Sequence, residues 1–219
     1  MAGEKVESLG TREMDPFARE VARKAKGFMA EEEGLRLYEL AREGARLGPV
    51  LEVGSYCGKS SIFLGCGVRE VGGRLVCLDH HRGSEENQQG QPWHDEELWD
   101  EKVHAMDSVG ELRRNLRIAG LEDNTVLLVT TTEVAAPLWT APLGMLFIDG
   151  GHTFRAAHGD YEAWSDRLLP GGILAIHDLF PDPDEGGQAP IEVYRRAVAS
   201  GDFEELEPTL TLGALRRKK

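Results

Sequence analysis

The segment FIDGGHTF (147–154) places an acid, two glycines and a histidine at the end of an apolar run, an arrangement suited to acid–base or metal chemistry. A second apolar run, GGILAIHD (171–178), also ends in an acid, Asp178. If Asp149 and Asp178 end neighbouring strands, their carboxylates repel each other, and a bound cation relieves the repulsion. Oxygen ligands favour a hard cation such as Mg²⁺, with Mn²⁺ as the alternative. The two acids therefore predict a metal site.

His152 follows Asp149 by three residues, and Gly150 and Gly151 allow the sharp turn that would bring its imidazole back over the metal. An unperturbed pKa of about 6.5 makes a histidine a suitable base near neutral pH. We therefore predict that His152 removes a proton from a hydroxyl group. His177 could add a third metal ligand only if its strand has already ended, because alternate residues of a strand face opposite sides. The competing interpretation is a helix-capping aspartate beside a surface histidine.

Seven apolar runs and the segments between them predict the elements that position these side chains. Five short runs alternate with helical patterns, which indicates a parallel sheet covered by helices on both faces. Two further runs follow each other closely and are typical of an antiparallel pair at one edge. The expected strands are 50–54, 74–79, 125–130, 145–149, 171–178, 203–208 and 210–216. The expected helices are two within 15–47, separated at Gly27 and Gly34, then 58–69, 95–119, 133–139, 154–168 and 187–200.

The first expected strand runs into the glycine-rich turn EVGSYCGKSS (52–61), which admits three interpretations. A dinucleotide-binding GxGxxG motif does not fit, because the residues after Gly54 do not continue it. A P-loop needs one more residue than the chain has between Gly54 and Gly58. An acid in the strand, followed by Gly54-Ser55 and Gly58, resembles the first motif of class I S-adenosylmethionine (SAM)-dependent methyltransferases.

This resemblance assigns roles to two further acids. Asp79 ends the second expected strand, at the position where the family has an acid that binds the ribose hydroxyls of SAM. A carboxylate suits that role because it accepts two hydrogen bonds from a vicinal diol. Glu133, after the third strand, lies where the family contacts adenine. The SAM site that the resemblance implies consists of Glu52, Gly54, Ser55, Gly58, Ser60, Asp79, His80, Glu133 and Asp149.

The same resemblance implies a Rossmann-like α/β fold with a seven-stranded, mostly parallel sheet in the order 3-2-1-4-5-7-6, helices on both faces and N-terminal helices. In this order the fourth and fifth strands are neighbours, which would place Asp149 beside Asp178. The D-x-x-H spacing, followed by an acid at the next strand end, resembles metal-dependent sugar O-methyltransferases of macrolide and related pathways. Those enzymes often carry two acids in tandem where this chain has His177-Asp178, which leaves the third metal ligand open.

The long polar loop 80–100 favours a carbohydrate acceptor and could act as a lid that excludes water. It resembles the loop of an actinobacterial group that includes a 1-O-methyltransferase of methylmannose polysaccharide synthesis. Trp93 and Trp99 offer indole rings that could stack on sugar faces, although Trp99 could instead belong to the core. His94 offers hydrogen bonds to hydroxyl groups.

These features predict Mg²⁺-dependent methyl transfer from SAM to a hydroxyl of a sugar or oligosaccharide, such as the 1-hydroxyl of a mannoside. The first alternative is the same chemistry on a catechol or another small diol. The second is a nucleotide-binding phosphotransferase that uses GSYCGKS, and the third is a non-catalytic SAM-binding protein.

The composition predicts one globular domain of 219 residues, with a helical cap at 1–47 and the Rossmann-like core at 48–219. A net charge of −13 argues against nucleic acid and anionic membranes as partners, because both need a positive surface. Three cysteines without metal-type spacing favour a reducing compartment. The N-terminal segment MAGEKVESLG has no apolar core of the kind that a signal peptide needs, and no apolar run is long enough to cross a membrane, so we expect a cytoplasmic protein. The family resemblance adds the expectation of a homodimer.

Overall fold

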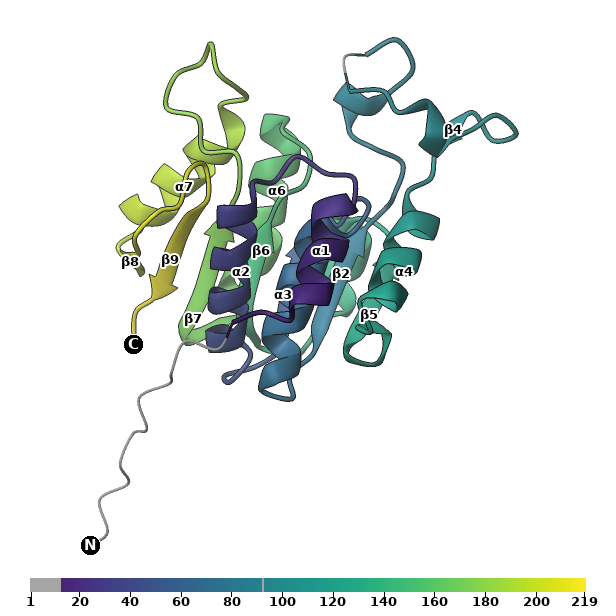
Figure 1. The fold of residues 1–219 in the computed structure, drawn as a ribbon. Coiled ribbons are helices and arrows are strands. Elements are labelled where there is room, and N and C mark those ends of the chain that lie inside the picture. The colour runs from purple at the N-terminus through teal and green to yellow at the C-terminus, as the bar shows by residue number, and fades with distance from the viewer. Residues whose placement is uncertain (1–12, 92) are drawn as a thin grey trace, which may run out of the picture.

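A seven-stranded sheet forms the centre of the structure, a computed structural model that describes residues 13–91 and 93–219 (Figure 1). Its strands are β1 (Val50–Val53), β2 (Leu75–Asp79), β5 (Thr125–Val129), β6 (Leu143–Ile148), β7 (Leu168–Ile176), β8 (Phe203–Glu205) and β9 (Gly213–Arg217). They lie in the order β5-β2-β1-β6-β7-β9-β8. The first five strands of this order are parallel, whereas β9 runs antiparallel to both β7 and β8. The Rossmann-like fold and the predicted order 3-2-1-4-5-7-6 are confirmed.

Helices cover both faces of this sheet, and each face has its own hydrophobic core (Figure 1). One core contains residues of α1 (Pro16–Lys24), α2 (Glu31–Gly44), α3 (Lys59–Glu70) and α4 (Val109–Ile118), and the other contains residues of α5 (Thr132–Ala135), α6 (Phe154–Trp164) and α7 (Ala189–Ala199). The strands read as continuous apolar runs because alternate residues enter opposite cores, as Val50 and Leu51 do. Short 3₁₀ helices are η1 (Glu85–Asn87), η2 (Glu96–Leu98), η3 (Glu122–Asn124), η4 (Ala136–Leu138) and η5 (Ser165–Arg167). Among the described residues, no helix is both long and apolar enough to cross a bilayer.

The two N-terminal helices pack against α3, and only one of the two expected breaks separates them. Gly27 lies between α1 and α2 with a φ of +147°. Gly34 instead lies inside α2, where an added Cβ would come within 2.3 Å of the Phe63 ring. The glycine therefore permits close packing of α2 on α3 rather than ending a helix. Part of the expected cap at 1–47, residues 1–12, lies outside the described residues.

The expected helix at 95–119 is wrong in its first half, because α4 begins only at Val109. Residues 95–108 instead form η2 and a short antiparallel pair, β3 (Trp99–Asp100) with β4 (Ala105–Met106). The Asp95 side chain caps η2 by accepting a hydrogen bond from the Glu97 amide at 3.0 Å. This segment is rich in acids and has no sustained apolar face, so local capping competes with a long helix. The insertion after β2 consequently extends to about residue 108.

Candidate active site

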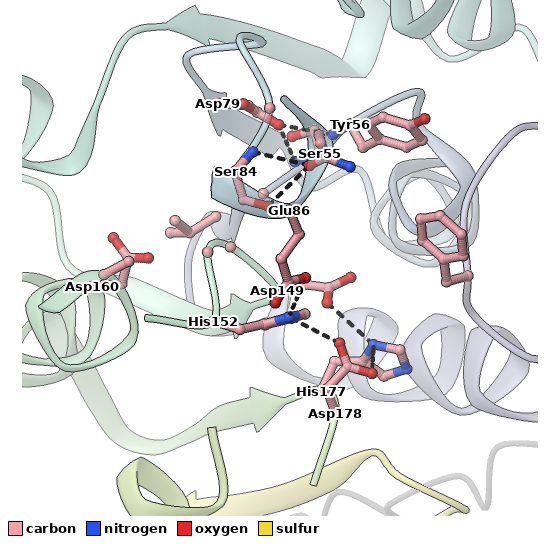
Figure 2. A pocket seen from close by; sticks show the side chains of 18 of the residues that line it. Ser55, Tyr56, Asp79, Ser84, Glu86, Asp149, His152, Asp160, His177 and Asp178 are labelled. Atoms are coloured by element: carbon pink, nitrogen blue, oxygen red, sulfur yellow. Dashed lines mark hydrogen bonds and ion pairs between the residues drawn. The ribbon is translucent and has the colours of Figure 1, made fainter. Parts of the chain in front are cut away.

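A cavity of about 990 Å³ opens at the carboxyl ends of the parallel strands (Figure 2). Ligands of open α/β sheets bind at this edge, and the volume is in the range of small-molecule sites. The α1–α2 linker and the insertion after β2 also contribute to the wall. The strand-end segments that line the cavity are residues 53–56, 78–80, 130–133, 149–152 and 177–178.

The turn after β1 brings its backbone very close to the end of β6. Gly54 has a φ of +91°, and an added Cβ would lie 2.1 Å from the carbonyl oxygen of Asp149. Gly58, directly before α3, has a φ of +89°. A side chain at position 54 would therefore separate the two strand ends. Gly54 is therefore needed for the packing of the turn, whether or not a ligand is bound.

Glu52 lies inside the protein rather than on the cavity wall. Its carboxylate accepts hydrogen bonds from the hydroxyls of Ser60 at 2.6 Å and Ser61 at 2.5 Å, which ties β1 to the first turn of α3. Burial raises the pKa of this carboxyl to about 7, and the serine hydrogen bonds offset part of that effect. Neither Glu52 nor Gly58 is among the residues that line the cavity, whereas Ser55 and Ser60 are.

Asp79 faces the cavity and also holds the turn after β1. Its Oδ2 accepts hydrogen bonds from the backbone amides of Ser55 at 3.0 Å and Tyr56 at 2.8 Å, and its Oδ1 accepts one from His81 at 2.6 Å. The carboxylate thus fixes the geometry of the wall that a ribose would meet. The structure brings to this one cavity seven of the expected SAM-site residues: Gly54, Ser55, Ser60, Asp79, His80, Glu133 and Asp149.

A further buried acid on the cavity wall, Asp160 of α6, was not expected from the sequence. It is 8% exposed, lies apart from Asp149 in Figure 2, and accepts a hydrogen bond from the hydroxyl of Thr132. Trp164 Nε1 donates to the same hydroxyl at 3.2 Å. Burial raises the pKa of Asp160 to about 6, against the opposing effect of the Thr132 hydrogen bond. In the sequence, a single acid within an amphipathic helix does not indicate that Asp160 lines the cavity.

Asp149, His152 and Asp178 converge on one side of the cavity (Figure 2). Asp149 directly follows β6, and Asp178 lies two residues beyond the end of β7. His152 Nε2 is 2.9 Å from Asp178 Oδ2, and its Nδ1 is 3.5 Å from Oε2 of Glu86 in the insertion. One potential ligand atom from each of Asp149, His152 and Asp178 lies within 4.8 Å of the other two.

His177 joins this cluster because β7 ends at Ile176. Asp178 then adopts a left-handed conformation with a φ of +58°, so the alternation of a strand no longer separates the two side chains. His177 Nδ1 lies 3.1 Å from Asp149 Oδ1 and 3.3 Å from Asp178 Oδ1. Its Nε2 lies 3.0 Å from Oε2 of Glu33, a buried residue of α2. The condition under which His177 could be a metal ligand is therefore met.

Charges of both signs alternate through this cluster. Burial lowers the pKa of His177, but the facing carboxylates outweigh burial and raise that pKa to about 12. The hydrogen bond to Asp178 raises the pKa of His152. Burial raises the pKa of Asp149, whereas hydrogen bonds from both histidines outweigh burial at Asp178 and lower its pKa. The cluster combines carboxylate oxygens with imidazole nitrogens, and this donor set fits a divalent metal ion.

The predicted acceptor residues separate into two groups. Trp93 lines the cavity, is 52% exposed, and contacts the exposed ring of Phe28 edge to face at 5.0 Å between centroids. His94 and Trp99 contact each other at 5.2 Å, and neither lines the cavity. Trp99 packs on a small buried cluster beneath the insertion, which agrees with the alternative that it belongs to the core. Phe28 was missed because a single aromatic residue beside the expected break at Gly27 gives no local indication that it reaches the cavity.

The profile of a protein family described as "Methyltransferase domain" matches residues 51–179, which is more than half of the chain. The chain belongs to this methyltransferase family. The match confirms the expectation of a methyltransferase and contains the turn at Gly54, Asp79 and the cluster at the ends of β6 and β7.

Solved structures share the fold of this methyltransferase. The O-methyltransferase TomG from Streptomyces achromogenes, involved in tomaymycin synthesis and solved with SAM, is 18% identical, with a TM-score of 0.63 over 94% of this chain and 92% of that chain. An O-methyltransferase from Bacillus cereus, solved with S-adenosylhomocysteine (SAH), is 18% identical, with a TM-score of 0.63 over 94% and 93%. An SAH-bound methyltransferase from Podospora anserina is 17% identical, with a TM-score of 0.65 over 95% and 91%.

Proposed function

We propose that this methyltransferase transfers a methyl group from SAM to a hydroxyl of a sugar or oligosaccharide, with the help of a divalent metal ion. One observation carries the proposal: the cluster of Asp149, His152 and Asp178 lies in the same cavity as the turn at Gly54 and the acid Asp79. The turn alone would indicate only a bound cofactor, and the cluster alone only a metal. SAM and SAH in structures of the same fold support the choice of cofactor.

In this proposal, separate residues contact the cofactor and the metal ion. Asp79 binds the ribose hydroxyls and Glu133 contacts adenine. Asp149, Asp178 and His177 would hold the metal ion, which would supply a lower pKa for the acceptor hydroxyl. These residues would position the acceptor relative to the methyl group, and such positioning supplies much of the rate in a direct transfer.

His152 acts as the base in this proposal. Its Nε2 faces Asp178 Oδ2 at 2.9 Å, so a proton on Nε2 is used in that hydrogen bond and Nδ1 is left to accept the proton of the acceptor. Asp178 then stabilises the imidazolium that forms. The acceptor O–H bond breaks as the new O–CH₃ bond forms, and the sulfur of SAM keeps the electron pair of its broken bond to the methyl group.

The exposed aromatic pair at the mouth of the cavity supports a sugar acceptor. Phe28 comes from the α1–α2 linker and Trp93 from the insertion, and together they present apolar ring surface beside polar cavity walls. Such a surface suits the C–H face of a pyranose. The alternative acceptor, a catechol or other small diol, would also stack there, so only a panel of acceptors separates the two.

The arrangement of the turn argues against nucleotide phosphotransfer. A P-loop binds phosphate through the backbone amides of its glycine-rich turn. Here the amides of Ser55 and Tyr56 already donate to the carboxylate of Asp79. A phosphate in their place would lie beside a negative charge.

The test is methyl transfer from labelled SAM by the full-length protein to mannosides, glucosides and catechols, with and without EDTA. We expect product with a sugar and its loss in EDTA. Transfer only to catechols would favour the alternative acceptor, and full activity in EDTA would remove the metal from the mechanism. Calorimetry that detects ATP binding but not SAH binding would overturn the proposal as a whole.

A further inference from the structure

The geometry around His177 points to the kind of metal that the site selects. We propose that His177 Nδ1 is a metal ligand oriented by Glu33, and that the resulting nitrogen–oxygen donor set selects a first-row transition ion such as Mn²⁺ or Fe²⁺ over Mg²⁺. The inference rests on the proposed function, because it assumes that the cluster beside the SAM cavity holds a metal. It differs from the Mg²⁺ expected when only the oxygens of Asp149 and Asp178 are considered.

Glu33 fixes which nitrogen of His177 faces the two aspartates. Its Oε2 lies 3.0 Å from His177 Nε2, and both side chains are 4% exposed. A carboxylate in this position accepts a hydrogen bond from Nε2–H, so Nδ1 is the nitrogen that faces Asp149 and Asp178. A metal ion bound between them would displace the proton that Nδ1 carries toward these carboxylates. Ligating histidines typically donate their second N–H to a carboxylate in this way, which orients the ring and strengthens the ligand.

Glu33 is itself held rigidly, so it can act as a positioning residue. Its Oε1 accepts hydrogen bonds from the backbone amide of Thr211 at 2.9 Å and from the Thr211 hydroxyl at 2.7 Å. Its Oε2 also accepts one from the Ala30 amide at 3.0 Å. Both oxygens are therefore fixed by separate segments of the chain.

The donor chemistry then distinguishes between metals. Mg²⁺ prefers oxygen ligands and gives up water reluctantly, whereas imidazole is a good ligand for Mn²⁺, Fe²⁺, Co²⁺ and Zn²⁺. His177 places one nitrogen within 3.3 Å of oxygens from both aspartates, and His152 lies at the other side of Asp178. The cluster thus offers two carboxylates and at least one imidazole.

The test uses the metal-stripped full-length protein with Mn²⁺ and Mg²⁺ as probes. Calorimetry gives the ratio of the two dissociation constants, and electron spin-echo spectroscopy of bound Mn²⁺ detects coupling to ligand nitrogen in protein labelled with ¹⁵N-histidine. We expect nitrogen coupling in the wild type. In His177→Asp we expect the coupling to disappear and the preference for Mn²⁺ to fall by at least about ten-fold. In Glu33→Gln we expect Mn²⁺ affinity to fall about 10–100-fold while the coupling persists.

The wild-type spectrum decides the question even if a variant does not fold, because the labelled histidines report directly on the bound ion. Tight Mn²⁺ binding without nitrogen coupling would overturn the inference while leaving metal-dependent transfer intact. Coupling that survives His177→Asp and disappears in His152→Gln would assign the nitrogen ligand to His152 and also overturn it. If the wild type binds neither ion and transfers methyl groups in EDTA, the metal role in the proposed function fails as well.

Discussion

The Nδ1 atom of His177 and the Oδ1 atom of Asp149 lie 3.1 Å apart, although 28 positions separate the two residues in the chain. Their proximity depends on two neighbouring parallel strands, β6 and β7, that end at the same edge of the sheet. It depends equally on the early end of β7 at Ile176. The candidate site is thus made by the ends of strands rather than by any continuous segment.

Replacement of His152 by alanine tests the base. We expect kcat to fall by about 10²–10⁴-fold, because a positioned general base contributes that much to proton removal. SAH affinity should stay unchanged, since the imidazole contacts Asp178 and Glu86. Calorimetry with SAH and initial rates with labelled SAM measure the two quantities. His104→Ala is the matched control, because His104 is exposed on the insertion and lies away from the cavity. An active His152→Ala enzyme would refute the assignment.

Replacement of Gly54 by alanine tests the close approach of β1 to β6. We expect the free energy of unfolding to fall by at least about 3 kcal/mol and SAH binding to be lost, because the new Cβ would meet the Asp149 carbonyl. Gly72→Ala is the control for backbone strain alone. Gly72 also has a positive φ, of +70°, but an added Cβ there meets no atom within 4 Å. It should cost only about 1–2 kcal/mol. Equal losses in urea unfolding would show that the contact is unimportant.

The pH dependence of stability tests the burial of Glu52. The pKa of its carboxyl is about 7 in the folded protein and 4.5 ordinarily, so the folded state binds more protons between these values. The contribution of the protonated Glu52 carboxyl to the free energy of unfolding is fully present below pH 4.5 and is lost as the pH rises through 7. We expect the free energy of unfolding of the wild type, relative to Glu52→Gln, to fall by on the order of 3 kcal/mol from pH 4.5 to pH 8. Parallel pH profiles for the two proteins would contradict this.

Phe28 and Trp93 test the acceptor surface. Replacing either ring by alanine should raise the KM for the acceptor several-fold and leave the KM for SAM unchanged, because the pair lies at the cavity mouth. The double variant should be less impaired than the sum of the single variants, with a coupling of about 0.5–1.5 kcal/mol for interacting rings. Leu138→Ala, which removes an exposed apolar side chain away from the cavity, is the control. Additive effects would mean that the rings act separately.

Local sequence patterns were sufficient to locate the strands of the sheet and the residues at their ends. Gly54 and Asp149 directly follow apolar runs, Asp79 ends one and Asp178 lies two residues beyond another, so their common edge follows once the strand order is known. The order itself came from the family resemblance, because apolar runs do not show which strands are neighbours.

The site residues that the sequence did not reveal reach the site only through the tertiary packing of the elements that carry them. Glu33 and Asp160 are acids within helices, and only the packing of α2 and α6 brings them to the site. Phe28 faces the cavity because the chain turns at Gly27. The helix expected at 95–108 is wrong because residue types alone do not show local capping. The Asp95 side chain accepts a hydrogen bond from the Glu97 amide, and this cap favours the short helix η2 over a long helix.

Glu33 links the N-terminal helices to the Rossmann-like core. Its carboxylate closes the first turn of α2 at Ala30, anchors Thr211 before β9, and supports His177 at the end of β7. Fraying of that one helical turn would release the ring that faces Asp149 and Asp178. A chimaera that joins residues 48–219 to a different N-terminal segment would keep every strand end yet lose the acceptor for the His177 proton. The helices before the first strand therefore cannot be exchanged as an independent module.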